Sequence, residues 1–245
     1  MKSLIQLQRL ALLAIFLLMT EPVFAGPGGM IAKVVWSSFW GKVLVILLAL
    51  IFLPLIIWSF IDEYRSEKRS RRDLAYMASH HPAFQWLPLR ERIQDCFYRI
   101  HVAWHHQHTD QAADCMTLWY QQNQQQVYLD RWAEQGLVNH CDIKRICTIK
   151  PILFVHRNQG TDHQNSALVV SVTARMKDYL ADKESGKVVE GDKKFKEVET
   201  IWTLVLEDDS WKVSNIEEAS TLFDYLKLRN QLPEIESTLS KQFKA

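Results

Sequence analysis

The sequence predicts an α+β domain that is preceded by a signal peptide and one transmembrane helix. Three observations support this fold class: an uncharged apolar run over residues 43–60, apolar residues at helical spacing after Pro88, and a period of two over 168–177, where every second residue is apolar. Helices that come first and are followed by a series of antiparallel strands are typical of the α+β layer arrangement.

The first 25 residues have the order of a secretory signal peptide. Lys2 and Arg9 precede an apolar stretch over 11–19, and small residues follow up to Ala25. The apolar stretch is about half the length that a helix needs to cross roughly 30 Å of hydrocarbon. We therefore expect residues 1–25 to be a leader and not a membrane anchor.

The second apolar segment is long enough to cross a membrane. Residues 43–60 contain no charged side chain, and Trp40 and Trp58 flank the segment where aromatic rings prefer the interface. We predict a transmembrane helix over 43–61, with residues 26–42 forming a short extracytoplasmic segment before it.

A basic run follows the predicted span, within a connector over residues 62–79. Its members are Arg65, Lys68, Arg69, Arg71 and Arg72. An excess of Lys and Arg marks the cytoplasmic side, so we expect a single-pass protein of the cytoplasmic membrane with its carboxyl-terminal domain in the cytosol. Beside anionic headgroups each of these residues contributes about 1 kcal/mol of attraction, which predicts lipid contact; fixing the orientation is a compatible second role.

The predicted helices follow one another along the chain. The connector extends the membrane helix until Pro82 breaks it. From Pro88 onward one long amphipathic helix is expected, because Ile93, Phe97, Ile100 and Trp104 recur at spacings of four and three.

Two shorter helices are predicted next. The first covers residues 110–119, with Asp110 as its N-cap, and the second covers 123–134 and ends at Gly136.

The predicted strands occupy the second half of the domain. They cover 149–156, 168–177, 198–206 and 211–216, and the last two form a hairpin. Pro151 places the first strand at a sheet edge or at a bulge. A carboxyl-terminal tail over 219–245 reads as weak helix at 222–228 and 235–243, on either side of Pro233.

Several motifs in this half keep the order and spacing of a known family. They are Gly186-Lys187-Val188-Val189-Glu190-Gly191-Asp192, Val198-Glu199-Thr200-Ile201-Trp202-Thr203-Leu204 and Trp211-Lys212-Val213-Ser214-Asn215-Ile216-Glu217. Over residues 80–218 the chain resembles the carboxyl-terminal domain of the mitochondrial inner-membrane import-motor anchor, which bacterial membrane proteins and a mitoribosomal large-subunit protein share.

The resemblance implies a cone-shaped domain of the nuclear-transport-factor-like superfold, in which three helices pack on a curved antiparallel sheet and cup a pocket. It also implies a membrane-associated adaptor that holds a soluble machine at the membrane. Because a superfold hosts unrelated activities, the fold alone does not give the function.

Aromatic residues of the predicted helix and sheet are candidates for lining that pocket. The candidates are Phe97, Ile100, Trp104, Trp202 and Trp211. Large aromatic residues at inward strand positions usually form core, so packing is the favoured interpretation for Trp202 and Trp211.

Two groups of side chains suggest chemistry and are weighed against a structural role. His101, His105, His106 and His108, with His80 and His81, could bind a metal ion, but they lack a companion ligand at suitable spacing. Asp178, Glu190, Asp192 and Glu199 could supply a catalytic acid pair, but a solvated face is favoured. We therefore expect no enzyme activity, no catalytic or metal-binding residues and no cofactor.

Composition limits the partners. The formal net charge is +1, whereas nucleic-acid-binding domains usually carry a large basic excess, so no nucleic-acid partner is expected. Cys96, Cys115, Cys141 and Cys147 lack metal-site spacing, which agrees with reduced thiols in the cytosol.

Three functions are compatible with the sequence. The favoured one is a membrane-tethered adaptor or scaffold whose cone domain binds a protein partner or lipid, linked to protein translocation or to assembly of a membrane complex. The alternatives are an accessory subunit that acts through its transmembrane helix and, less favoured, a pocket enzyme for a small hydrophobic substrate. Self-association stays open.

Overall fold

The computed structural model describes residues 38–157 and 163–239. The chain divides into two compact units, residues 1–60 and 61–245. The predicted signal peptide and most of the predicted extracytoplasmic segment lie outside the described residues.

The first described element is the helix α3, Phe39–Ala78. In the part of the chain that the structure describes, α3 is the one helix long and apolar enough to cross a membrane. The helix continues through the predicted connector and ends four residues before Pro82, which begins the short 3₁₀ turn η1, Pro82–Phe84. The predicted extension of the helix and its break are both confirmed.

The long amphipathic helix is confirmed as α4, Trp86–His105, which buries Ile93, Phe97 and Ile100 on one face. The next predicted helix is wrong in its bounds. Thr109–Cys115 forms a 3₁₀ segment (η2) that is interrupted at Ala112, where φ is −124°. The helix α5, Leu118–Asn123, starts afresh because the hydroxyl of its N-cap Thr117 accepts a hydrogen bond from the backbone N–H of Tyr120.

The last predicted helix before the sheet is confirmed, with an unexpected wide turn. The π-helical segment η3, Gln124–Leu129, leads into α6, Asp130–Glu134. Gly136 follows with φ of +70°, a left-handed conformation that glycine adopts without steric cost and that ends helices. The predicted stop at Gly136 is therefore confirmed.

One antiparallel sheet of four strands follows, in the order β1-β2-β3-β4. Its strands are β1 (Leu137–Val155), β2 (Ala167–Asp182), β3 (Val188–Glu207) and β4 (Ser210–Glu218). The predicted α+β class and the β3–β4 hairpin are confirmed. β1 and β3 begin well before their predicted starts at 149 and 198. The prediction missed the first halves of these strands because they lack the alternation that marks a strand with one buried face.

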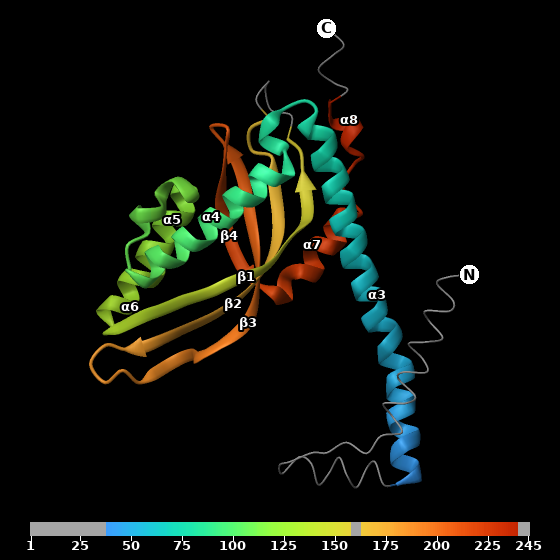
Figure 1. Ribbon diagram of the computed structural model, residues 1–245, viewed down its shortest axis with the longest axis horizontal. Coiled ribbons are helices and arrows are strands. Elements are labelled where there is room, and N and C mark those ends of the chain that lie inside the picture. Colours follow the sequence, from blue (N-terminus) through green and yellow to red (C-terminus); the bar gives the residue numbers. More distant parts are fainter. Residues whose placement is uncertain (1–37, 158–162, 240–245) are drawn as a thin grey trace. The chain divides into compact units, whose positions relative to one another are not determined.

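Alternating residues of the sheet face two separate cores. Leu168, Val170 and Val172 pack with α4 in the main core. Val169 and Ile201 face the other way and pack with Leu222 and Leu226 of α7 (Leu222–Arg229). Figure 1 shows α4 crossing one face of the sheet and α7 lying behind the strands. The period-two pattern of the sequence therefore positions both layers.

The edges of the sheet are irregular. Pro151 lies in the edge strand β1 at a register shift between Pro151 and Leu153, as predicted. At the other side β4 pairs with β3 only as far as Glu218 opposite Thr200, so residues 188–199 of β3 continue without a β4 partner.

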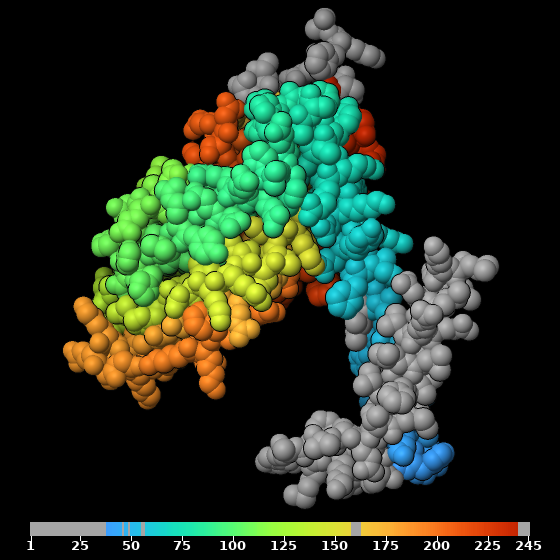
Figure 2. Space-filling model, viewed as in Figure 1, coloured from blue at the N-terminus to red at the C-terminus, as the bar shows by residue number. Residues whose placement is uncertain are grey.

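The tail helices are confirmed as α7 and α8, Ile235–Leu239, and residues 240–243 lie outside the described residues. Ile235 and Leu239 belong to the main core, and so do Leu74 and Met77 of α3. In Figure 2 the surface of this part of α3 adjoins that of β1. Residues 61–79 and residues 219–239 of the tail therefore pack within the second compact unit.

Candidate functional site

The end of α3 has one buried face. Leu74 and Met77 are completely buried, and Ser66, Ser70 and Asp73 are buried polar residues on the same helix. Spacings of three and four residues place them on one side of a helix. The predicted connector is therefore a packed element, and its polar side chains meet the rest of the fold.

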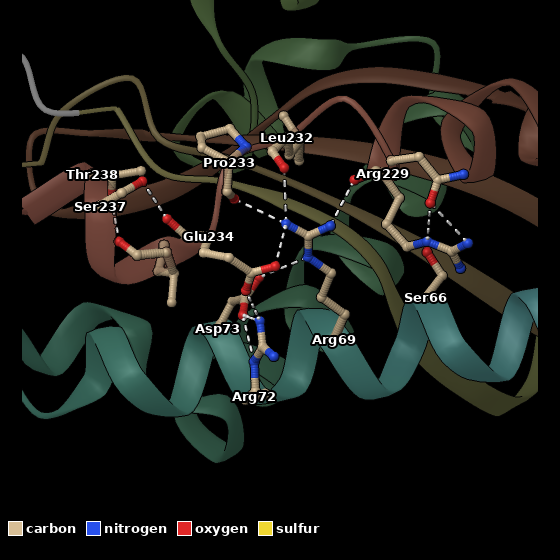
Figure 3. Close-up of polar contacts among 12 residues, drawn as sticks. Ser66, Arg69, Arg72, Asp73, Arg229, Leu232, Pro233, Glu234, Ser237 and Thr238 are labelled. Carbon is tan, nitrogen blue, oxygen red and sulfur yellow. Dashed lines mark hydrogen bonds and ion pairs between the residues drawn. The ribbon is translucent and has the colours of Figure 1, made fainter.

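Arg69 joins α3 to the chain that follows α7. Its Nη1 donates to the carbonyl of Arg229 at 2.8 Å, and its Nη2 donates to the carbonyls of Leu232 at 3.0 Å and Pro233 at 2.9 Å. The last carbonyls of a helix have no partner within it, and a cation suits this negative end. Figure 3 shows the Arg69 side chain reaching from α3 to these carbonyls.

Asp73 lies one turn further along the same face. Its carboxylate is 3.5 Å from Nε of Arg69 and accepts a hydrogen bond of 2.9 Å from Arg72, whose Nη2 also contacts Glu234 at 2.7 Å. Burial raises the pKa of Asp73, while the hydrogen bond and charge of Arg72 act in the opposite direction. Burial has the larger effect, so the pKa of Asp73 is raised although both arginines lower it.

Arg229 makes the reciprocal contact from α7 to the start of the folded unit. Its Nη1 donates to the backbone carbonyl of Asp62 at 2.8 Å and its Nη2 donates to the Asp62 carboxylate at 2.5 Å. Only 11% of the Arg229 side chain and 18% of the Asp62 side chain are exposed. This ion pair is therefore shielded from most of the solvent.

Two further contacts fix α3 to the edge strand β1. The hydroxyl of Ser66 donates to the carbonyl of Ile152 at 2.7 Å, and Nζ of Lys150 lies 2.7 Å from the carboxylate of Glu63. The hydrogen bond with Glu63 raises the pKa of Lys150. The helix thus protects an edge that would otherwise be open to pairing with another strand.

We call this set of contacts the helix junction. It consists of Asp62, Glu63, Ser66, Arg69, Arg72 and Asp73 of α3, with Lys150, Ile152, Arg229, Leu232, Pro233 and Glu234 as partners.

The five basic residues predicted to contact lipid divide into two groups. Arg69 and Arg72 belong to the helix junction, and Arg71 pairs with Glu67 at 2.8 Å and lies 4.7 Å from the ring centre of Trp86. Arg65 and Lys68 are exposed on α3. Lipid contact stays a prediction for all five.

The predicted pocket residues also divide into two groups. Phe97, Ile100, Trp202 and Trp211 are buried in the main core. Trp104 lines a pocket of about 550 Å³, together with His101 and Asp178. We call this pocket the β4 notch, because it lies where β4 ends.

Two titratable groups of the β4 notch are shifted from their ordinary behaviour. Burial lowers the pKa of His101 to about 4, against a weaker opposing effect of its hydrogen bond with the Phe97 carbonyl. Burial, followed by the negative charge of Glu190, raises the pKa of Asp178. In the sequence analysis His101 was a candidate metal ligand and Asp178 a candidate catalytic acid. Glu199, another candidate catalytic acid, lines the same pocket.

The remaining candidates form no common site. His105 and His106 are exposed, Glu190 and Asp192 lie on the exposed part of β3, and the four cysteines are free. Within residues 38–157 and 163–239, no three side chains of the metal-ligating types come together.

The acidic half of the helix junction was missed by sequence reasoning. The sequence interpretation gave no weight to Asp62 and Glu63 beside the basic run, and it assigned no role to Asp73 or Arg229. The usable signal was the spacing of Ser66, Ser70, Leu74 and Met77, small and apolar residues that recur at three or four positions inside a charged segment.

Comparison with known families decides the assignment. A sequence model of the Tim44-like domain matches residues 70–218. The chain belongs to the Tim44-like domain family. This match confirms the predicted resemblance, and it begins within the docked part of α3.

Other comparisons add less. No curated protein matched the chain. Among solved structures, the crystal structure of the intermembrane space region of the chloroplast protein ARC6 is similar to it, with 12% sequence identity and a TM-score of 0.36, over 55% of this chain and 98% of that chain.

Proposed function

We propose that this Tim44-like protein is a membrane-tethered adaptor or scaffold with a binding role and no catalytic one. In this proposal residues 1–25 are a signal peptide, the apolar part of α3 crosses the bacterial cytoplasmic membrane once, and the Tim44-like domain faces the cytosol. The length and apolar character of α3 and the basic residues that follow its apolar part support this orientation.

The observation that carries the proposal is the helix junction. A flexible tether needs no specific contacts with the domain that it holds, whereas α3 contributes buried side chains and ion pairs to the fold itself. Ordering these long side chains has an entropic cost that a plain linker would avoid. Residues 61–78 are therefore part of the packed domain, which suits an adaptor better than a flexible linker would.

We further propose that the helices and sheet form the cone of the nuclear-transport-factor-like superfold. Its exposed surfaces would bind a protein partner, or anionic lipid through Arg65 and Lys68, in protein translocation or in the assembly of a membrane complex. The packing of α4 on one face of the antiparallel sheet supports this arrangement.

Three experiments test the proposal. A reporter fused after Ala245, together with the thiol accessibility of Cys147 in intact cells, determines the compartment; labelling from outside would contradict the cytosolic placement.

Crosslinking in intact membranes should capture one defined protein partner, and repeated recovery of the monomer alone would contradict the adaptor role. Replacing residues 43–60 by an unrelated apolar span should preserve function, whereas loss would favour an accessory subunit that acts through its span.

A further inference from the structure

Two cysteines from neighbouring elements lie in the main core. Cys96 belongs to α4, and Cys115 is the last residue of the 3₁₀ segment η2. Both side chains are completely buried members of this core. The adaptor role uses neither thiol, although a thiol becomes a strong nucleophile once it is deprotonated.

Two arginines of α4 hold Cys115 close to Cys96. Arg92 and Arg99 lie four residues before and three residues after Cys96, which places them on its face of the helix. Both bind Asp114, the residue before Cys115. Nη2 of Arg92 donates to the Asp114 carbonyl at 2.5 Å, and Nη1 of Arg99 donates to the Asp114 carboxylate at 2.8 Å. The end of η2 is therefore fixed on the turn of α4 that carries Cys96.

The two thiols are hydrogen-bonded to each other, with Cys96 as the donor. This hydrogen bond, followed by burial, raises the pKa of Cys96. The same hydrogen bond lowers the pKa of Cys115; the positive charges of Arg92 and Arg99 act in the same direction, and burial opposes them. Cys115 is thus the thiol of the pair that is favoured as a thiolate, the reactive form.

The segment η2 is the element through which an oxidant can reach the pair. The 3₁₀ hydrogen bonds have poorer geometry than those of an α-helix, and the segment is interrupted at Ala112, where φ is −124°. Its ion pairs with α4 lie at the surface, since 58% of the Asp114 side chain is exposed. Segments of this kind open locally while the rest of a fold stays intact. Opening of η2 would expose both thiols together.

We propose that Cys96 and Cys115 are a redox-sensitive pair, which a peroxide converts into a disulfide that joins α4 to η2. The Cys115 thiolate attacks one oxygen of hydrogen peroxide and the O–O bond breaks. The leaving hydroxide takes up the proton that Cys115 released, which gives water and a sulfenic acid at Cys115.

The second thiol completes the reaction. The sulfur of Cys96 attacks the sulfur of the sulfenic acid, the S–S bond forms, and the hydroxide that leaves takes the Cys96 proton as water. Two thiols and one molecule of hydrogen peroxide thus give one disulfide and two molecules of water. This pair is separate from the helix junction and does not depend on the adaptor role.

The test counts the thiols of the full chain in detergent micelles after treatment with hydrogen peroxide. The peroxide is removed with catalase, and the chain is then denatured and treated with N-ethylmaleimide. The reduced chain has four cysteines and should take up four maleimides, whereas the oxidised chain should take up two. A tryptic digest without reductant should link the peptide that contains Cys96 to the peptide that contains Cys115, and dithiothreitol should separate them.

Matched variants assign the two steps. In Cys96→Ala the sulfenic acid at Cys115 lacks its second thiol, so it should persist and be captured by dimedone. Cys141→Ala removes a thiol of β1 outside the pair and should leave the disulfide unchanged. In the unaltered chain the pair should react about tenfold faster than Cys141, because burial raises the pKa of Cys141.

The thiol count of the unaltered chain needs no variant, so the test stays valid if Cys96→Ala fails to fold. Uptake of four maleimides, under conditions that oxidise the urea-unfolded chain, would overturn the proposal. A disulfide that joins other cysteines, or that joins two chains, would overturn it as well.

Discussion

Arg229 donates hydrogen bonds to both the carboxylate and the backbone carbonyl of Asp62, a residue 167 positions earlier in the chain. The contact links the beginning and the end of the folded unit. Removing one partner of a buried ion pair leaves the other charge buried and unpaired. The resulting loss of stability is larger than the net stabilisation that the intact pair provides. The pair therefore joins α7 to the part of α3 that belongs to the folded unit.

Asp62→Ala should lower the free energy of unfolding by about 1–3 kcal/mol, because the Arg229 guanidinium stays shielded without its carboxylate. Urea unfolding of the full chain in detergent measures the effect. Glu91→Gln, which neutralises an exposed acid of α4, is the control and should change the value by less than about 0.5 kcal/mol. Equal effects of the two substitutions would show that the Asp62–Arg229 pair does not stabilise the fold.

Arg69→Lys should release the tail even though the charge is kept. A guanidinium reaches three carbonyls at once with its fixed fork of donors, whereas an ammonium is a compact point charge. Hydrogen exchange of the amides in α8 should accelerate about tenfold in the variant, while exchange in β2 stays unchanged. Lys68→Ala on the exposed side of α3 is the control, and identical exchange in Arg69→Lys and the unaltered chain would refute the proposed role.

Met77→Ala should destabilise the whole folded unit by about 2–5 kcal/mol, the usual cost of a large-to-small change in a core. Tyr64→Ala, on the same helix but 65% exposed, should have little effect. Thermal unfolding of the two variants compares a core position with a surface position. If Met77→Ala were as mild as Tyr64→Ala, α3 would be a linker after all.

Acid should weaken the fold through His101. Its pKa is about 4 in the folded chain, below the ordinary value of about 6.5, so the unfolded chain binds more protons between these values. The contribution of neutral His101 to the free energy of unfolding is complete above pH 6.5, and it is lost as the pH falls toward 4.

The variant His101→Gln isolates this effect. Between pH 6.5 and pH 4.5 the unaltered chain should lose about 2–3 kcal/mol more than the variant, as urea midpoints at the two pH values would measure. Parallel losses in the two chains would mean that His101 does not titrate on unfolding.

The sequence was most informative where one face of an element is buried. Ile93, Phe97 and Ile100 revealed α4, and the alternation from Leu168 to Met176 revealed β2, because burial imposes the period of the backbone on the side chains. The first half of β3 escaped prediction because residues 189–197 are exposed on both faces, so no pattern is imposed.

The sites were less predictable for a different reason. Arg69 and Asp62 act through partners more than 160 residues away, and local spacing carries no information about such pairs. The β4 notch depends on where β4 stops pairing, which the alternation of the hairpin did not reveal. Trp104 was predicted as a pocket residue, and of the five pocket candidates it is the one that lines the notch.

The central claim is that α3 beyond residue 60 is a fixed part of the folded domain. Spin labels at two exposed positions, Lys68 on α3 and Glu184 in the β2–β3 turn, test it by electron–electron double resonance on the full chain in lipid bilayers. A single narrow distance distribution, broadened by Asp62→Ala, is the predicted result. A broad distribution in the otherwise unaltered chain would contradict the claim.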